Sequence, residues 1–296
     1  MRIVVTGAGG FIGGFLVEAL MERGDHVAGW TRNEVDVTGR RSIADALARF
    51  DPELVVHLAA QSLPGRSWTD PAETYRVNVE GTINLLEAAR SQATPPRVLL
   101  AGSSAEYAEP PDGTRISEGA AISPNSPYGA SKVAAAQIGE LYRRQYGVEV
   151  VGFRPFAFVG PRKTGDVCSD FARRIVAIER GADPTMTVGD TTVVRDMIDV
   201  RDGIAGLLRI IDAGASGETY NICGGRPVSV AEVLETLRGF ASAPVEIVRD
   251  PALLRPLEQK VKIGDPSKLR ALDWAPVHTL DETLAGVLAY WRANER

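Results

Sequence analysis

A glycine-rich segment near the amino terminus constrains the fold of this chain more than any other feature. The segment, Gly7-Ala8-Gly9-Gly10-Phe11-Ile12-Gly13, follows a short apolar run, Ile3–Thr6, and opens a stretch from Phe11 to Arg23 whose apolar residues have helical spacing. A strand, a glycine turn and a helix in this order are typical of the first unit of a dinucleotide-binding sheet. Side chains at the three spaced glycines would obstruct the turn, the pyrophosphate, or the contact between helix and strand.

The chain alternates between short apolar runs and longer amphipathic stretches, the pattern of parallel strands joined by crossover helices. The expected strands are Ile3–Thr6, His26–Trp30, Leu54–Ala60, Arg97–Gly102, Glu149–Phe153 and, late in the chain, Thr219–Cys223. The expected helices are Phe11–Arg23, Ser42–Phe50 with Ser42 as its N-cap, Asn78–Arg90, the helix that contains Tyr128 and Lys132, Ser229–Phe240 and Leu280–Arg292. This pattern predicts an α/β fold with a Rossmann-type doubly wound parallel sheet.

Loops rich in glycine, proline and charge begin near Pro155 and change the character of the chain. We therefore predict an NAD(P)-binding Rossmann domain over residues 1–155 and a smaller C-terminal α/β lobe over residues 156–296, which binds the substrate. Residues 219–223 are expected to return to the first sheet as a late strand.

Composition argues against several classes of function. The formal net charge is -5 and there is no long basic run, so we expect no nucleic-acid partner. No apolar run reaches the roughly 18 residues of a membrane helix. Cys168, Cys223 and the three histidines are scattered, which predicts reduced cysteines and no metal site. Because the chain enters a strand directly after Met1, we expect no signal peptide and a cytoplasmic protein.

The end of the second expected strand should select the dinucleotide. An acidic side chain there binds the ribose hydroxyls of NAD, whereas a cation binds the 2′-phosphate of NADP. The sequence reads Trp30-Thr31-Arg32-Asn33, without an acid, and a guanidinium can bind a phosphate through two N–H groups. The sequence thus favours NADP(H) and leaves NAD(H) open, with a solvated Arg32 as the alternative. Asp36 is a candidate partner for the adenine amino group.

A second group of residues can transfer a proton. Tyr128 and Lys132 are four positions apart and share one face of a helix, which Ser126 can cap and Pro127 can begin. A free phenol has a pKa of about 10, and a nearby ammonium lowers that pKa toward neutrality. Ser103, at the carboxyl end of a central expected strand, can donate to the substrate oxygen. Together with the glycine turn, these residues predict hydride transfer between a nicotinamide and a carbon that bears oxygen.

These residues resemble the extended short-chain dehydrogenase/reductase family, and the similarity runs over essentially the whole chain. Further matching motifs are Leu58-Ala59-Ala60, Asn78-Val79-Glu80-Gly81-Thr82, Arg154-Pro155-Phe156, Gly160-Pro161 and the segment 194–202. Members of this family act on nucleotide-diphosphate sugars. The resemblance implies catalytic roles for Ser103, Tyr128 and Lys132. It implies a dinucleotide site formed by Gly7, Gly10, Phe11, Ile12, Gly13, Thr31, Arg32, Asp36, Val37, Leu58, Ala59, Ala60, Asn78, Tyr128, Lys132 and Pro155.

Two C-terminal segments resemble the family members that modify GDP-mannose: Arg255-Pro256-Leu257-Glu258 and Gly264-Asp265-Pro266-Ser267-Lys268-Leu269. The implied substrate is a nucleotide-diphosphate sugar, with Arg195 and Arg255 on the pyrophosphate, Glu258 near the nucleoside and Ser104 as a further contact. The implied reaction is reduction of the C4 keto group of GDP-4-keto-6-deoxy-D-mannose to give GDP-D-rhamnose.

Two departures from the family pattern bear on the reaction. The 4,6-dehydratases carry a Glu at the position of Ala105 and use it to eliminate water. Glu106 is offset by one residue, and on a strand it would face the opposite side, which favours ketone reduction. Ala157 and Phe158 stand where relatives usually have Asn and a polar residue, so we expect an apolar wall in the substrate pocket.

Other functions share these motifs and stay open. A nucleotide-sugar epimerase with tightly bound NAD has the same core, and the short loop between Arg32 and Asp36 is similar to that of dTDP-linked rhamnose-forming reductases. A regulator can bind NADP without chemistry, although retention of Tyr128 and Lys132 argues against this. The resemblance also implies a homodimer formed through the expected helices 78–90 and 128–146.

Overall fold

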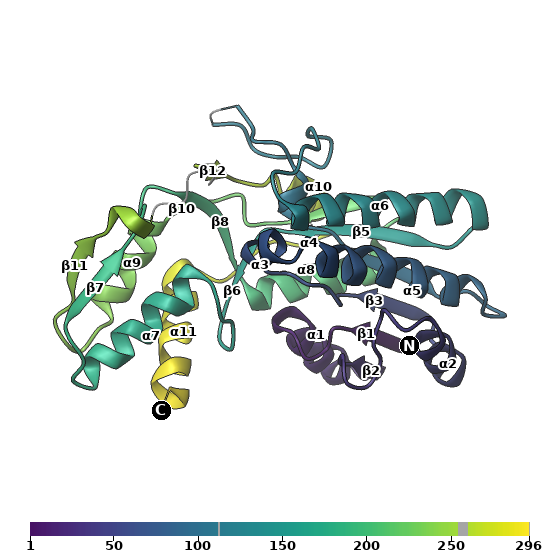
Figure 1. The fold of residues 1–296 in the computed structure, drawn as a ribbon, viewed down its shortest axis with the longest axis horizontal. Helices are drawn as coiled ribbons and strands as arrows, with labels where there is room; N and C mark the ends of the chain where they lie inside the picture. The colour runs from purple at the N-terminus through teal and green to yellow at the C-terminus, as the bar shows by residue number, and fades with distance from the viewer. Residues whose placement is uncertain (112, 254–259, 296) are drawn as a thin grey trace.

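The computed structural model describes residues 1–111, 113–253 and 260–295. Its centre is a sheet of six parallel strands in the order β2-β1-β3-β4-β5-β9 (Figure 1). The strands are β1 (Arg2–Thr6), β2 (His26–Trp30), β3 (Leu54–His57), β4 (Arg97–Ala101), β5 (Val150–Pro155) and β9 (Thr219–Ile222). The strand order reverses between β1 and β3, which confirms the predicted doubly wound sheet and its late strand.

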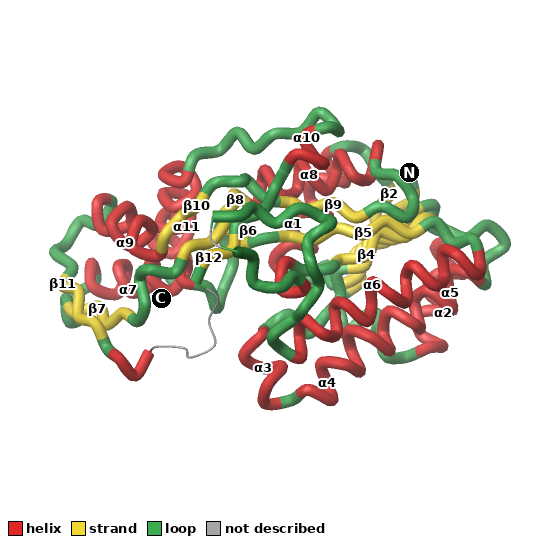
Figure 2. The backbone as a smooth tube through the Cα atoms, turned by 90° about the horizontal axis from the view of Figure 1, so that it is seen from above, coloured by secondary structure: helices red, strands yellow, loops and turns green. Residues whose placement is uncertain are grey.

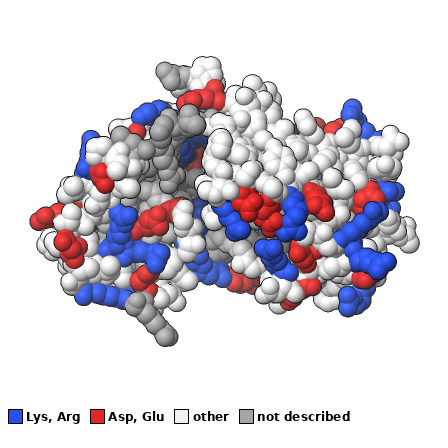
Figure 3. Space-filling model, in the orientation of Figure 1, with Lys and Arg blue, Asp and Glu red and all other residues white. Residues whose placement is uncertain are grey.

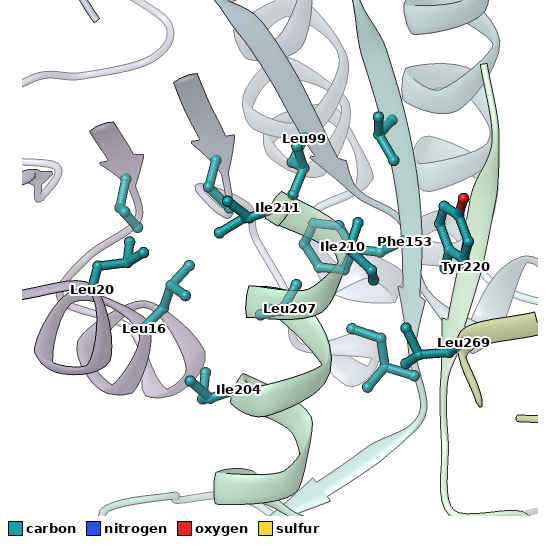
Figure 4. Packing of buried hydrophobic residues seen from close by; sticks show 14 of the residues in the cluster. Leu16, Leu20, Leu99, Phe153, Ile204, Leu207, Ile210, Ile211, Tyr220 and Leu269 are labelled. Atoms are coloured by element: carbon teal, nitrogen blue, oxygen red, sulfur yellow. The ribbon is translucent and has the colours of Figure 1, made fainter. Parts of the chain in front are cut away.

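Helices cover both faces of this sheet (Figures 1 and 2). On one face lie α1 (Phe11–Glu22) and α8 (Val200–Ala213), and on the other lie α2 (Arg40–Phe50), α5 (Gly81–Arg90) and α6 (Pro127–Tyr146). Figure 4 shows the first interface, where Leu207 and Ile210 of α8 lie near Leu99 and Phe153 of the sheet and Leu16 and Leu20 of α1 lie on the other side of α8. Each of these side chains is buried, which stabilises the fold by about 1.5–3 kcal/mol per side chain.

A second core is built from the C-terminal half of the chain. Three helices surround it, α7 (Val167–Glu179), α9 (Val230–Gly239) and α11 (Leu280–Asn294). Strand β8 (Val194–Asp199) pairs with β6 (Ala157–Val159), β10 (Pro227–Ser229) and β12 (Val261–Lys262), and β7 (Thr185–Val188) pairs with β11 (Glu246–Arg249). The shorter elements are α3 (Pro64–Thr69), α4 (Pro71–Tyr75), a π-helix (Arg76–Glu80), α10 (Ser267–Arg270) and 3₁₀ turns at Ser104–Glu106 and Pro251–Leu253.

The chain crosses between the two cores more than once. Side chains of α8, β9 and α10, among them Ile204, Ile222 and Leu269, belong to the core of the parallel sheet. Residues after 155 therefore contribute to both cores. The predicted assignment of residues 156–296 to a substrate-binding lobe stays a prediction.

Several predicted boundaries differ from the structure: the strand expected over 54–60 ends at His57, and the helix expected over 78–90 begins as a π-helix and becomes α-helical at Gly81. A third difference has a local physical reason. Ser42 is not the N-cap of its helix, because α2 begins at Arg40 and Gly39 is the N-cap. The Asp36 carboxylate accepts hydrogen bonds from the N–H and hydroxyl of Thr38 at 2.9 Å each, which forms a tight turn just before the helix.

Phe158 belongs to the core of the sheet rather than to a pocket wall. Its side chain is 2% exposed and packs against α8, where a Cβ on Gly203 would lie 2.3 Å from the ring. Ala157, the preceding residue of β6, faces the other way and is half-buried. The expectation that Phe158 forms an apolar wall of the substrate pocket is therefore wrong.

The substitution Gly203→Ala should lower the free energy of unfolding by about 1–3 kcal/mol, because the added methyl group overlaps the Phe158 ring. Gly286→Ala in α11 is the matched control, since a Cβ there meets nothing within 4 Å. Urea denaturation measures both variants. Equal stability of Gly203→Ala and the natural chain would mean that the ring and α8 are not in this contact.

Candidate active site

The turn between β1 and α1 is closely packed at two of its glycines. Gly7 has a φ of 71°, which other residues adopt only with strain, and a Cβ on it would lie 2.7 Å from the Ala59 nitrogen. A Cβ on Gly13 would lie 2.2 Å from the Gly7 oxygen. Gly10 is exposed at the outer side of the turn. Two of the glycines thus pack the turn, and the third leaves its surface open to a ligand.

The amino terminus of α1 fits a bound anion. Gly10 is the N-cap, no side chain caps the helix, and its first turn has no acidic residue. The first N–H groups of the helix, from Phe11 and Ile12 onward, have no partner within the helix itself. The helix dipole adds a partial positive charge at the same place. The residues present therefore fit a dinucleotide pyrophosphate.

The end of β2 carries charges of both signs. Arg32 has 68% of its side chain exposed, and its Nη2 lies 3.6 Å from a carboxylate oxygen of Glu73. Glu34, which the sequence analysis overlooked, turns back onto the strand end and accepts from the Thr31 N–H and hydroxyl at 2.8 and 2.7 Å. An acid therefore does reach the end of the strand, contrary to the expectation from residues 30–33.

Other predicted cofactor residues lie at the same edge of the sheet. Leu58, Ala59 and Ala60 follow β3, and Ala59 donates its N–H to the Thr6 hydroxyl at 3.1 Å. Pro155 ends β5. Because parallel strands end at one edge, these residues lie at the same edge as the glycine turn, and Ala59 lies directly beside Gly7.

Asp36 and Val37 lie between β2 and α2 and differ in how deeply they are buried. Asp36 is half-buried and its contact with adenine stays a prediction. Val37 is buried against α5, where a Cβ on Gly81 would lie 2.8 Å from its Cγ2.

Asn78 holds a loop in place and has its side chain occupied. Its Oδ1 accepts from the Gln61 N–H at 2.8 Å, and its Nδ2 donates to the Gln61 carbonyl at 3.1 Å and to the Ser131 hydroxyl at 2.9 Å. The residue is 2% exposed. The structure therefore gives Asn78 a positioning role, and its predicted place in the dinucleotide site stays a prediction.

Ser103, Tyr128 and Lys132 come together at the carboxyl end of β4. Ser103 begins the 3₁₀ turn shortly after β4, and Ser126 caps α6, so that Tyr128 lies in the first turn of the helix as predicted. Ser103 is a polar neighbour of the Tyr128 phenol and acts to lower its pKa. One turn further along α6, Lys132 donates to the Ala101 carbonyl at 2.9 Å.

Burial dominates the electrostatics of this group. It raises the pKa of Tyr128, and Ser103 opposes the rise only in part. Burial lowers the pKa of Lys132 to about 8 and that of His57, on the neighbouring β3, to about 3. The expectation that Lys132 brings the pKa of Tyr128 toward neutrality is therefore wrong. The phenol stays neutral and can donate a proton.

Glu106 lies on the 3₁₀ turn, not on a strand, so its predicted placement on an opposite strand face is wrong. The carboxylate turns back and accepts the Ser103 N–H at 2.8 Å, and its other oxygen pairs with Arg154 at 2.6 Å. Both oxygens are thus occupied, and Ala105 offers no carboxylate in its place.

The predicted substrate residues are placed only in part. Arg195 lies on β8, and its guanidinium donates to the Val194 carbonyl at 2.9 Å. Lys262 is its register partner on β12 and donates to the Ser104 carbonyl at 3.1 Å. Burial and Arg195 lower the pKa of Lys262 to about 8. No local motif in the sequence marks this lysine, so its place in the site was not predicted.

Arg255 and Glu258, the other two predicted substrate residues, lie outside the described residues. Figure 3 shows that the surface is hollowed between the two lobes. Within residues 1–111, 113–253 and 260–295, no helix combines the length and apolar character needed to cross a membrane. The same residues contain no cluster of three or more His, Cys, Asp or Glu side chains that could hold a metal ion.

A parallel sheet that ends at a glycine turn and beside a half-buried phenol is typical of a nicotinamide-dependent oxidoreductase. The model of the NAD dependent epimerase/dehydratase family matches residues 3–223. The chain belongs to this family of NAD(P)-dependent, nucleotide-sugar-modifying enzymes, as the resemblance predicted.

Individual relatives cover nearly the whole chain. GDP-6-deoxy-D-mannose reductase of Pseudomonas aeruginosa is 32% identical over 100% of this chain and 98% of the relative. The solved structure of RMD from Pseudomonas aeruginosa complexed with NADPH is 31% identical, with a TM-score of 0.91 over 99% of both chains. UDP-glucose 4-epimerase of Thermus thermophilus in complex with NAD is 30% identical, with a TM-score of 0.90 over 99% of this chain and 100% of that chain.

The substitution Gly13→Ala should weaken NADPH binding by at least about tenfold, because the added Cβ pushes the Gly7 carbonyl and distorts the phosphate-binding turn. Gly14→Ala is the matched control, since its Cβ would approach its nearest neighbour, the Ala8 oxygen, only to 3.7 Å. Isothermal titration with NADPH measures both dissociation constants. Equal constants for the two variants would contradict this account of the turn.

Proposed function

We propose that the protein is an NADP(H)-preferring reductase of a 4-keto-6-deoxy sugar carried on a nucleoside diphosphate. The favoured reaction converts GDP-4-keto-6-deoxy-D-mannose to GDP-D-rhamnose. The observation that carries the proposal is the convergence of Ser103 and the neutral Tyr128 phenol at the carboxyl end of β4, because reduction of a ketone requires one proton donor. The similarity to GDP-6-deoxy-D-mannose reductase supports the choice of sugar and nucleotide.

In the proposed mechanism, Ser103 and Tyr128 bind the C4 carbonyl oxygen. When bound, the reduced nicotinamide supplies a hydride to C4. Tyr128 donates its proton to the oxygen, so the C=O group becomes CH–OH and the side chain is left as phenolate. Lys132, one turn along α6, would help to hold the dinucleotide at its ribose.

Dehydration is disfavoured by the same residues. Elimination of water needs a second acid–base group, and the structure offers none at Ala105. The Glu106 carboxylate is fully buried and is occupied by Ser103 and Arg154. A reduction needs no such group.

Substrate binding is proposed to use the two cations at the boundary between the lobes. Arg195 and Lys262 are register partners on β8 and β12, and Lys262 reaches the turn that contains Ser104. A diphosphate between them would neutralise both charges. Arg255 and Glu258 remain proposed contacts to the pyrophosphate and the nucleoside.

We also propose a cytoplasmic homodimer. Helices α5 and α6 lie side by side, joined by the Tyr142 hydroxyl, which donates to Glu87 at 2.6 Å. Leu141 and Tyr146 of α6 are 54% and 52% exposed. Helix packing between two copies would bury these side chains.

The second candidate is a nucleotide-sugar epimerase with tightly bound NAD, favoured by the similarity to UDP-glucose 4-epimerase. An assay of NADPH consumption with GDP-, dTDP- and UDP-linked 4-keto sugars separates the candidates. We expect turnover that is highest with the GDP-linked 4-keto-6-deoxy sugar. Purification with tightly held NAD and interconversion of UDP-hexoses without NADPH consumption would replace the reductase by the epimerase.

Tyr128→Phe should lower kcat for ketone reduction by about 10²–10⁴-fold, because the proton donor is lost. NADPH affinity should change less than about twofold, since the glycine turn is untouched. Tyr142→Phe on the same helix is the control for loss of a phenol. Steady-state kinetics and NADPH titration give both quantities, and turnover retained in Tyr128→Phe would remove the proposed role.

The proposed preference for NADPH rests on Arg32 and is opposed by Glu34. Arg32→Ala should weaken NADPH binding by about tenfold and leave NADH binding within twofold, because it removes the partner of the 2′-phosphate. Glu34→Gln should raise the affinity for NADPH relative to NADH, since it removes a negative charge that would repel the 2′-phosphate. Dissociation constants for both dinucleotides test the pair. An unchanged ratio in Arg32→Ala would place the phosphate elsewhere.

A further inference from the structure

Glu106 is a buried charge that the mechanism above leaves without a role. It is 0% exposed. Its Oε1 accepts the Ser103 N–H at 2.8 Å, while the Ser103 hydroxyl oxygen accepts the Ala105 N–H at 3.1 Å. This reciprocal capping box fixes both the main chain and the side chain of Ser103.

The second oxygen of Glu106 links this turn to two neighbouring strands. Arg154 of β5 donates from Nε to Glu106 at 2.6 Å and from Nη1 to the Tyr107 hydroxyl at 3.0 Å. Tyr107 in turn donates to Asn221 of β9 at 2.7 Å. The packing is close, because a Cβ on Gly102 would lie 2.3 Å from the Glu106 carboxylate. The turn that follows β4 and carries Ser103 is therefore held in place by side-chain hydrogen bonds to β5 and β9.

The carboxylate of Glu106 also acts on the two titratable groups of the site. It raises the pKa of Tyr128, adding to the effect of burial, and it raises the pKa of Lys132 against the effect of burial. Both influences favour the protonated form of the group. For Tyr128 that form is the proton donor of a ketone reduction.

The other charged groups near Glu106 do not cancel its effect on the pKa values of Tyr128 and Lys132. A cavity of about 530 Å³ behind Lys132 is lined by Glu106, by His57 from β3 and by Arg154 from β5. His57 is neutral at ordinary pH because burial lowers its pKa to about 3. Arg154 is the direct partner of Glu106 and offsets part of its charge. The remaining charged residues of the cavity have side chains at least 42% exposed: Glu140, Arg144 and Glu218.

We propose that Glu106 is a positioning residue for the proton transfer, which holds Ser103 in place and keeps a negative charge behind the Tyr128 phenol, so that the site favours reduction. This inference rests on the proposed ketone reduction. It assigns Arg154 the role of the cation that holds the carboxylate and moderates its charge. Glu106 itself acts through Ser103 and Tyr128.

The test is Glu106→Gln, which keeps an oxygen acceptor for Ser103 and removes the charge. We expect the Tyr128 phenol to titrate about 0.5–1 pH unit lower, because the neutral form loses the charge that favours it. The alkaline limb of kcat should move the same way. Ultraviolet difference absorbance of phenolate, taken against Tyr128→Phe, measures the titration without substrate. Glu179→Gln, which breaks the Arg292 ion pair at 2.6 Å, is the control for loss of a partly buried pair.

Arg154→Lys is a second variant, for which the Tyr128 titration should move in the opposite direction. It tests the inference if circular dichroism shows that Glu106→Gln does not fold. The substitution replaces the guanidinium by an ammonium that keeps the charge but is more strongly hydrated. Less of the Glu106 charge is then offset at close range, and the Tyr128 titration should move to higher pH. If Glu106→Gln folds and Tyr128 titrates at the same pH as in the unsubstituted protein, the inference is overturned. If only Arg154→Lys folds, a Tyr128 titration at the same or a lower pH overturns it. Because the titration needs no substrate, failure to reduce any 4-keto sugar would count against the proposed function alone.

Discussion

The candidate site depends on the parallel direction of all six strands of the central sheet. Parallel strands end at one edge, so the Gly7 turn after β1, Ser103 after β4 and Pro155 at the end of β5 lie along the same edge although they are distant in sequence. The strand order reverses between β1 and β3, the position at which open α/β sheets bind their ligands. An antiparallel sheet would divide these residues between two edges, and neither edge would hold both a dinucleotide and a proton donor.

Residues whose roles depend on local backbone geometry are predictable from the sequence. The glycine turn and the Ser126 cap each act within a few positions, and the structure has both where they were expected. Ser42 was misplaced as a cap because the turn at Asp36 fixes the start of the helix earlier. Phe158 was misplaced because its surroundings are set by α8, far along the chain.

Residues whose partners are distant in the chain were not predictable in the same way. Lys262 touches Ser104 only because β12 pairs with β8 beside the turn after β4. Glu34 shows that a carboxylate a few residues beyond a strand can still fold back onto its end. Charge and spacing in the sequence therefore identify the glycine turn well. They identify the surroundings of the substrate poorly, because those are assembled from both cores.

The chemistry of the site depends on which residue of the turn after β4 carries a carboxylate. At Ala105 a carboxylate would serve as the acid–base group that elimination of water requires. At Glu106 the 3₁₀ turn directs it back to the Ser103 N–H and to Arg154, where it is buried and occupied. It then influences Tyr128 and Lys132 by charge and favours their protonated forms. Moving the carboxylate by one residue, from position 105 to Glu106, thus replaces a group that could react by one that acts only through its charge. Reduction of a ketone needs no second acid–base group, because a single proton donor suffices.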